Sequence, residues 1–124
     1  VHKSRRDDTW TTVEAPFDLA PTLATATADQ AILIDCATMW LTNHLLEDHD
    51  LSAQSDMLID ALKSCKAPIV IVSNEVGQGI VPDNALSRQF REAQGRLNIA
   101  LAAQSDLSIQ VVAGLPNVLK GMLP

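Results

Sequence analysis

The sequence predicts an α/β domain built around a mostly parallel sheet. Three apolar runs mark the expected strands: "AILIDC" at 31–36, "PIVIVSN" at 68–74 and "LSIQVVAG" at 107–114. The first two are nearly continuous, which is typical of strands buried on both faces of a parallel sheet, whereas the third alternates and is expected nearer an edge. Helical patterns lie between the runs, and this alternation indicates a three-layer α/β architecture.

The helical segments are predicted from apolar residues that recur every three or four positions. One helix is expected in "SAQSDMLIDALKSCK", capped by Asp50 or Ser52, and one in "NALSRQFREAQGRLNIALAAQ", capped by Asp83. A third is expected through "TMWLTNHLLEDH" after the first strand. A short helix near 17–27, interrupted by Pro21, is the weakest of these predictions.

Length and composition predict a single globular domain over residues 1–124. The chain is 47% hydrophobic and 19% charged, with a net charge of -6. That acidity disfavours a duplex nucleic acid as partner, since such binders carry a basic face. No apolar run reaches the ~18 residues of a membrane span. Cys36 and Cys65 have no metal-site spacing, and we expect two reduced thiols in a cytoplasmic protein.

The chain begins with Val inside a charged segment, "VHKSRRDDT", which is too polar for a signal peptide. Three strands also make a thin parallel sheet. Both features predict that strands precede Val1 and that the fold here is incomplete at its N-terminus.

Acidic and amide side chains follow the first two predicted strands. Asp35 ends one strand, and Asn74 with Glu75 follows the next. In open α/β sheets the carboxyl ends of parallel strands form the ligand-binding edge, so these residues are expected on the same rim. "AILIDC" also has the form of a Walker B strand, whose acid binds Mg²⁺ directly or through water. An Asp at the end of a strand is, however, more often a helix cap or a turn former.

Other polar clusters carry a structural and a functional interpretation. Gly77 and Gly79, after Glu75, permit a turn or a close approach of backbone to a ligand. The segment "HLLEDHD" at 44–50 holds two histidines five positions apart, which is not the spacing of a helical metal site, so a solvated helix end is expected. Trp10 and Trp40 are expected as core or partner-facing anchors.

The stretch "SNEVGQGIVPDNALSRQFREAQGRLN" closely resembles the signature of the bifunctional adenosylcobinamide kinase/adenosylcobinamide-phosphate guanylyltransferase family of cobalamin biosynthesis. The resemblance extends back through "ILIDCATMWLTNHLL" and "WTTVEAPFDL", and the first His lies at a matching distance from Trp10. It covers essentially the whole chain in collinear order. It implies a three-layer RecA-like P-loop NTPase fold.

The resemblance also implies an activity. Members phosphorylate adenosylcobinamide with a nucleoside triphosphate, ATP or GTP, and then transfer GMP from GTP to the product through a guanylylated histidine. The matching nucleophile here is His2, and a neutral imidazole is competent for this attack. Lys3, Arg5 or Arg6 is expected to offset phosphate charge.

The resemblance assigns three carboxylates to the nucleotide site. Asp35 matches the Walker B acid and is the expected Mg²⁺ ligand. Glu14 is expected to contact the nucleotide or to make a structural hydrogen bond, and Glu75 to position substrate or metal. The family also implies a homotrimer.

One family motif has no match among the 124 residues: the Gly-rich phosphate-binding loop that ends in Lys-Ser or Lys-Thr. Two other hypotheses therefore stay open beside the bifunctional enzyme. The chain alone could be a non-catalytic nucleotide-binding or oligomerising module, or it could belong to an unrelated nucleotide kinase that shares only the Walker B pattern.

Overall fold

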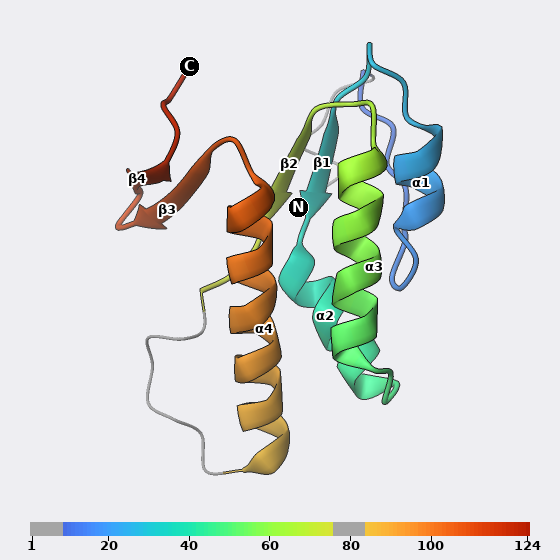
Figure 1. The fold of residues 1–124 in the computed structure, drawn as a ribbon, viewed down its shortest axis with the longest axis vertical. Coiled ribbons are helices and arrows are strands. Elements are labelled where there is room, and N and C mark those ends of the chain that lie inside the picture. The colour runs from blue at the N-terminus through green and yellow to red at the C-terminus, as the bar shows by residue number, and fades with distance from the viewer. Residues whose placement is uncertain (1–8, 76–83) are drawn as a thin grey trace. The chain divides into compact units, whose positions relative to one another are not determined.

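Two parallel strands form the sheet of the first part of the chain (Figure 1). The computed structural model describes residues 9–75 and 84–124. Strand β1 spans Ile32–Asp35 and β2 spans Ile69–Val72, paired so that Ile32 lies opposite Ile69 and Asp35 opposite Val72. β-Branched residues make up all of β2 and half of β1, as suits an extended backbone packed between neighbours. The first two predicted strands are thus confirmed.

Only one face of this strand pair is packed among the described residues. Ile34 is buried and its neighbours on that face are half-buried, whereas Leu33, Val70 and Val72 on the other face are exposed. The prediction of strands buried on both faces is therefore wrong for this pair. A strand that is buried on both faces needs a continuous run of apolar residues. The run alone does not bury the strand, because a second layer of structure must also cover the other face.

Three helices accompany the sheet in the first part of the chain: α1 (Ala20–Thr25), α2 (Ala37–Leu46) and α3 (Leu51–Ser64). The Asp50 side chain caps α3 by accepting a hydrogen bond from the Ala53 N–H at 3.1 Å, which confirms one of the two predicted caps. The sequence predicted that Pro21 would interrupt α1, and that prediction is wrong. Pro21 lies in the first turn, where a missing N–H costs the helix no hydrogen bond.

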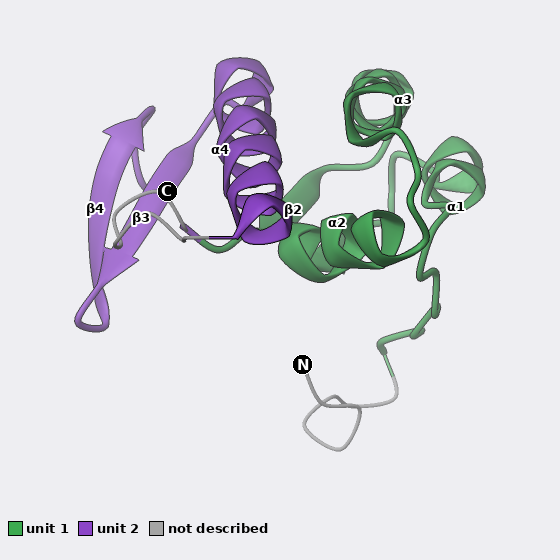
Figure 2. Ribbon diagram, turned by 90° about the horizontal axis from the view of Figure 1, so that it is seen from below, with its two compact units in different colours: residues 1–74 green, residues 75–124 purple. Residues whose placement is uncertain are grey.

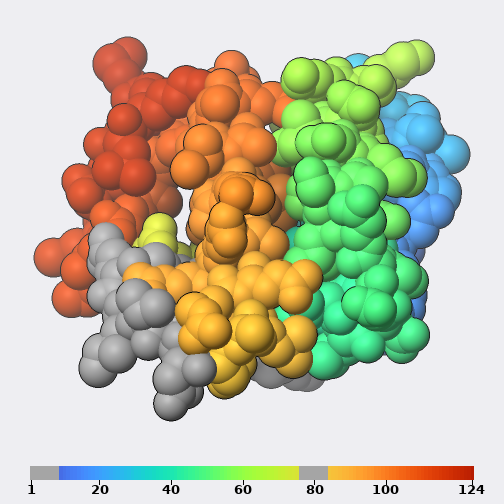
Figure 3. All heavy atoms as spheres, turned by 60° about the horizontal axis from the view of Figure 1, so that its bottom comes forward, coloured from blue at the N-terminus to red at the C-terminus, as the bar shows by residue number. Residues whose placement is uncertain are grey.

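Leucines from all three helices build the core of this part. Leu23 of α1, Leu41 of α2 and Leu58 and Leu62 of α3 are buried, and Leu41 is completely inaccessible. Helices α1 and α3 pack against each other, which Figure 3 shows as adjoining blue and green side chains. The i, i+4 spacing of Leu58 and Leu62 explains why α3 presents one apolar side to its neighbours.

The second part of the chain begins with the longest helix, α4, which spans Ala85–Gln104. Its cap is Asn84, whose side chain accepts a hydrogen bond from the Ser87 N–H at 2.7 Å. The prediction of Asp83 as cap is therefore wrong by one position. Asn satisfies a free N–H of the first turn as well as Asp does, so the two adjacent residues were equivalent on sequence grounds.

An antiparallel hairpin follows α4. Strand β3 (Ser108–Val112) pairs with β4 (Leu115–Lys120), so the strand predicted at 107–114 exists, but its described partner is antiparallel and was not predicted. Ala113 and Gly114 form the two-residue turn with φ of 53° and 75°. Positive φ at both turn positions matches the twist of the paired strands, which is why such turns favour hairpins.

The end of β4 is fastened to the end of α4. The Lys120 ammonium donates to the carbonyls of Ala102 and Ala103, each at 3.0 Å. A cation is favourable there because the last helical carbonyls have no partner within the helix. Gly121, with φ of 80°, lies so near the backbone of Asp106 that an added Cβ would come within 2.3 Å of its carbonyl oxygen.

The chain divides into two compact units, residues 1–74 and 75–124 (Figure 2). The first holds the parallel pair with α1 to α3, and the second holds α4 with the hairpin. The α/β class is confirmed, whereas a single domain over 1–124 stays a prediction. None of the helices within residues 9–75 and 84–124 combines the length and hydrophobicity that crossing a bilayer requires.

Leu41 provides a test of the first unit's core. Replacing Leu41 by Ala should lower the free energy of unfolding by ~2–5 kcal/mol, because it removes a fully buried side chain and leaves a cavity. Leu46 lies on the same helix but is 71% exposed, so Leu46→Ala is the matched control and should change stability little. Urea denaturation followed by circular dichroism measures both, and equal losses would contradict this description of the core.

Ala113 provides a test of the hairpin. Ala113→Asn should raise the free energy of unfolding by about 0.5–1 kcal/mol, because Asn tolerates the left-handed conformation better than Ala. Ala113→Val should lower it, since a β-branched side chain is strained at positive φ. Thermal unfolding of the two variants should shift in opposite directions. Shifts of the same sign would argue against the turn geometry.

Candidate nucleotide site

The carboxyl ends of β1 and β2 lie at the same edge of the sheet, as the sequence predicted. The parallel register places Asp35, the last residue of β1, opposite Val72 of β2. Helix α2 begins immediately after β1, and the Cys36 thiol caps it by accepting from the Met39 N–H at 3.4 Å. The start of α2 therefore meets this edge, where its free N–H groups favour a negatively charged ligand.

Thr38 joins the two strand ends. Its Oγ1 accepts a hydrogen bond from the backbone N–H of Asn74 at 2.8 Å. Asn74 comes two residues after β2, so this bond fixes the chain where it leaves the sheet. The prediction that Asn74 reaches the rim carrying Asp35 is confirmed, and Thr38 is part of that rim.

A hollow of about 1230 Å³ lies along β1 within the first unit and reaches Asp35 at the end of that strand. It is bordered by residues 9–16, by α1 and the turn that follows it, by β1 and by the first turns of α2. The volume lies above the ~300–1,000 Å³ typical of small-molecule pockets. Its wall mixes aromatic and aliphatic side chains, including Trp10 and Met39, with the carboxylates of Glu14 and Asp35.

Two of the four predicted site residues line this hollow. Glu14 and Asp35, from segments far apart in the sequence, line the same hollow, and both are exposed. Glu75 is also exposed and is the first residue of the second unit. His2, with Lys3, Arg5 and Arg6, lies outside the described residues, as do Gly77 and Gly79. The chemical roles of His2, Glu14, Asp35 and Glu75 stay predictions.

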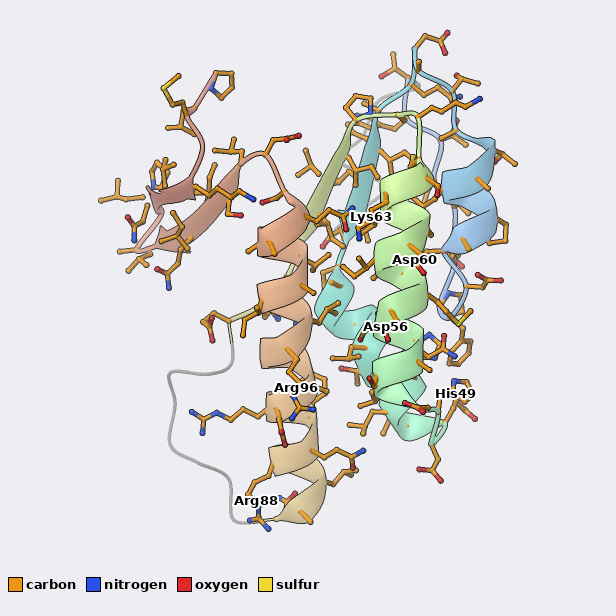
Figure 4. The ribbon with its side chains drawn as sticks, in the orientation of Figure 1. His49, Asp56, Asp60, Lys63, Arg88 and Arg96 are labelled. Atoms are coloured by element: carbon orange, nitrogen blue, oxygen red, sulfur yellow. The ribbon has the colours of Figure 1, made fainter. Side chains whose placement is uncertain are left out.

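His44 corrects one prediction. It was expected on a solvated helix end, yet it is only 2% exposed, packed edge-on against Phe17 and Trp40. Its Nδ1 lies 2.8 Å from Nδ1 of His49, which is in the connection after α2 (Figure 4). Asp48, at φ 56°, turns the chain so that the His49 N–H reaches the His44 carbonyl at 3.0 Å. His49 itself is exposed.

The comparison with known proteins identifies the family. The family described as cobinamide kinase / cobinamide phosphate guanyltransferase matches residues 1–119. This chain belongs to that family. The resemblance stated from the sequence is confirmed, and with it the P-loop NTPase fold class.

Individual relatives agree. The bifunctional adenosylcobalamin biosynthesis protein CobP of Pseudomonas aeruginosa is 42% identical over 97% of this chain and 71% of its own length. The proteins named CobU, also described as bifunctional adenosylcobalamin biosynthesis proteins, are 40% identical in Salmonella typhimurium and 35% in Escherichia coli. Each alignment covers 92% of this chain and 72% of the relative.

The donor set at the rim fits Mg²⁺ held jointly with a nucleotide. In the parts of the chain that the structure describes, no three His, Cys, Asp or Glu side chains form a ready metal cage. Magnesium in kinases needs none, because it is bound by one or two carboxylates with water and substrate phosphates. Asp35 is a hard, exposed oxygen donor at the strand end and suits that arrangement.

Cys36 and Cys65 are both free, as predicted.

Sequence reasoning missed that α2 has a polar side as well as an apolar one. Trp40 was expected as a core or partner-facing residue and lies in the core, at 5% exposed. Trp40, Asn43 and His44 occupy positions i, i+3 and i+4, so they share one side of the helix. That spacing was readable in "WLTNH". The sequence could not predict that these three side chains bind backbone carbonyls of residues 16–17 instead of facing solvent.

The Thr38–Asn74 bond can be tested by amide exchange. Thr38→Val removes the acceptor while keeping the shape, and it should speed hydrogen exchange of the Asn74 amide by about tenfold, equivalent to ~1.4 kcal/mol. Thr38→Ser keeps the hydroxyl and is the matched control. NMR-detected exchange measures both variants. Unchanged exchange in Thr38→Val would show that this bond does not hold the strand end.

Proposed function

We propose that this protein is the bifunctional enzyme that its family name describes. It phosphorylates adenosylcobinamide with a nucleoside triphosphate and then transfers GMP from GTP to the phosphate, forming adenosylcobinamide-GDP. The observation that carries the proposal is the family match over residues 1–119, in a chain where Glu14, Asp35 and the start of α2 border one hollow. A nucleotide at such an edge follows the general rule for ligands of open α/β sheets.

The guanylyl transfer is proposed to use His2 as the nucleophile. An imidazole nitrogen attacks the α-phosphorus of GTP, a P–N bond forms, and the bond to the bridging oxygen breaks so that pyrophosphate leaves. A phosphate oxygen of adenosylcobinamide phosphate then attacks the same phosphorus and the P–N bond breaks. Covalent catalysis replaces one difficult displacement by two easier ones. The cationic side chains of Lys3, Arg5 and Arg6 are proposed to offset the phosphate charge.

The carboxylates have proposed roles around the nucleotide. Asp35 would hold Mg²⁺, which supplies neutralisation of phosphate charge when bound. Glu14 lines the same hollow and is proposed to accept hydrogen bonds from the ribose or base. Glu75, exposed just after β2, is proposed to position substrate or metal. These roles are supported by the residue types, by the match to the family's motifs and, for Glu14 and Asp35, by their shared hollow.

The assembly and location are part of the same proposal. The resemblance implies a homotrimer acting in the cytoplasm, with a nucleoside triphosphate and adenosylcobinamide or its phosphate as partners. The proposal includes either ATP or GTP as the donor of the phosphate in the kinase step. Sedimentation of the full chain should give about three times the monomer mass, and a monomer would contradict the trimer.

The nucleophile is tested by trapping. Incubation of the full chain with GTP labelled on its α-phosphate should leave acid-labile label on the wild-type protein and none on His2→Asn, because the Asn amide is not nucleophilic. Asp60→Asn, on α3 (Figure 4), is the control and should keep the label, since Asp60 does not line the hollow. Equal labelling of wild type and His2→Asn would exclude His2. An unlabelled wild type would instead favour the non-catalytic module.

The metal role of Asp35 is tested separately. Asp35→Asn should lower both transfers by about tenfold or more and raise the Mg²⁺ concentration required for half-maximal rate, because a neutral amide binds the ion weakly. Asp56→Asn, on α3 (Figure 4), is the charge-matched control and should leave both rates unchanged. An unaltered Mg²⁺ requirement in Asp35→Asn would contradict the assignment.

A further inference from the structure

Three side chains on one side of α2 hold the main chain at residues 16–17. The Trp40 indole Nε1–H donates to the Phe17 carbonyl at 2.8 Å, and His44 Nε2 lies 2.9 Å from the same oxygen. The Asn43 amide Nδ2 donates to the Pro16 carbonyl at 3.0 Å. Both lone pairs of the Phe17 carbonyl are therefore in use. Two consecutive carbonyls are bound by one helix.

The hydrogen-bond network assigns the tautomer of His44. A carbonyl oxygen only accepts, so His44 Nε2 carries the proton that the bond to Phe17 requires. In the neutral ring Nδ1 is then an acceptor, and His49 Nδ1 at 2.8 Å supplies a hydrogen to it. The edge contacts with Phe17 and Trp40, at centroid distances of 5.4 and 4.7 Å, hold the ring plane. His49 thus orients His44 toward the carbonyl.

Burial of two of the three donors strengthens these constraints on position. Trp40 is 5% and His44 is 2% exposed, whereas Phe17 is 38% exposed and the Asn43–Pro16 bond lies at the surface. Removing one partner of a buried hydrogen bond leaves the other unsatisfied, which costs more than the bond contributes. The carbonyls of residues 16–17 are consequently held in one place relative to α2 and β1.

The held carbonyls lie at the end of the segment that lines the hollow. Residues 9–16 border the hollow together with Asp35, and Glu14 is two positions before Pro16. His2 precedes the same segment in the chain. His44 is not among the residues that line the hollow, so its effect on the chemistry would pass through the main chain that it binds.

We infer that His44, oriented by His49, is a positioning residue for guanylyl transfer. With Trp40 and Asn43 it fixes the segment that carries Glu14 into the hollow. The inference rests on the proposed function and adds to it a role for a residue outside the nucleotide site. Displacements of ~1 Å remote from reacting atoms can cost ~100-fold in rate, so a loosened segment should slow the transfer itself more than nucleotide binding.

The test compares variants that differ in one donor. His44→Phe keeps an aromatic ring but cannot donate to Phe17, and it should lower kcat for GMP transfer by ~10- to 100-fold while KM for GTP changes less than about threefold. His44→Gln retains an amide donor and should recover most of the rate. Leu46→Ala is the control, because Leu46 lies on the same helix, is 71% exposed and does not line the hollow, so this variant should stay near the wild-type rate.

A purely structural role is separated by a second measurement and a second variant. Rates are normalised to the folded fraction from thermal unfolding of the full chain. Trp40→Phe removes the other donor to the same carbonyl and should show the same fall in kcat, which preserves the test if His44→Phe does not fold.

The outcomes are distinct. A wild-type protein that forms no GMP adduct ends the proposed function before any variant is compared. With an active wild type, three results would overturn the positioning role. The first is an equal loss of activity in His44→Phe and His44→Gln, and the second is a loss that vanishes after normalisation to the folded fraction. The third is a kcat within about threefold of wild type for His44→Phe, or for Trp40→Phe if His44→Phe does not fold. A selective fall in kcat with rescue by Gln supports it.

Discussion

The parallel pairing of β1 with β2 is the constraint on which the first unit depends. Its register brings the two strand ends together, with Asp35 opposite Val72, and every later feature of the rim starts from there. Helix α2 leaves the end of β1, so its Thr38 hydroxyl can receive the Asn74 N–H as the chain leaves β2. A shift of one residue in that register would turn Asp35 to the opposite face of the sheet and separate it from the hollow.

The candidate site is therefore assembled by two kinds of interaction. Strand pairing positions the Asp35 side of the hollow, whereas the polar side of α2 positions the Glu14 side by holding the main chain of residues 16–17. Glu14 itself lies in a segment without regular structure, where no strand or helix could align it. This division explains why a helix in the interior of the first unit carries a His and an Asn at positions where leucines would satisfy packing alone.

The sequence was informative wherever periodicity and local chemistry decide the structure. The strands at Ile32–Asp35 and Ile69–Val72, three of the helices and the Asp50 cap follow from patterns within a few residues. It failed where the partner is distant. His44 was misassigned because the carbonyl that it binds is 27 positions earlier, and β4 was missed because it contains Pro116 and Asn117 and is stabilised by pairing with β3. Glu14 and Asp35 could be chosen by motif, but their common hollow arises only from the tertiary fold.

Main-chain acceptors at residues 16–17 also have an evolutionary consequence. Every amino acid presents the same carbonyl, so the bond from Asn43 does not depend on the side chain at position 16, whereas the Phe17 ring also packs against His44. The donors are different, because few side chains can replace an indole, an amide or an imidazole at those distances. Substitutions should therefore be tolerated more readily at position 16 than at the three donor positions of α2, although two of those donors, Trp40 and Asn43, line the hollow as Pro16 does.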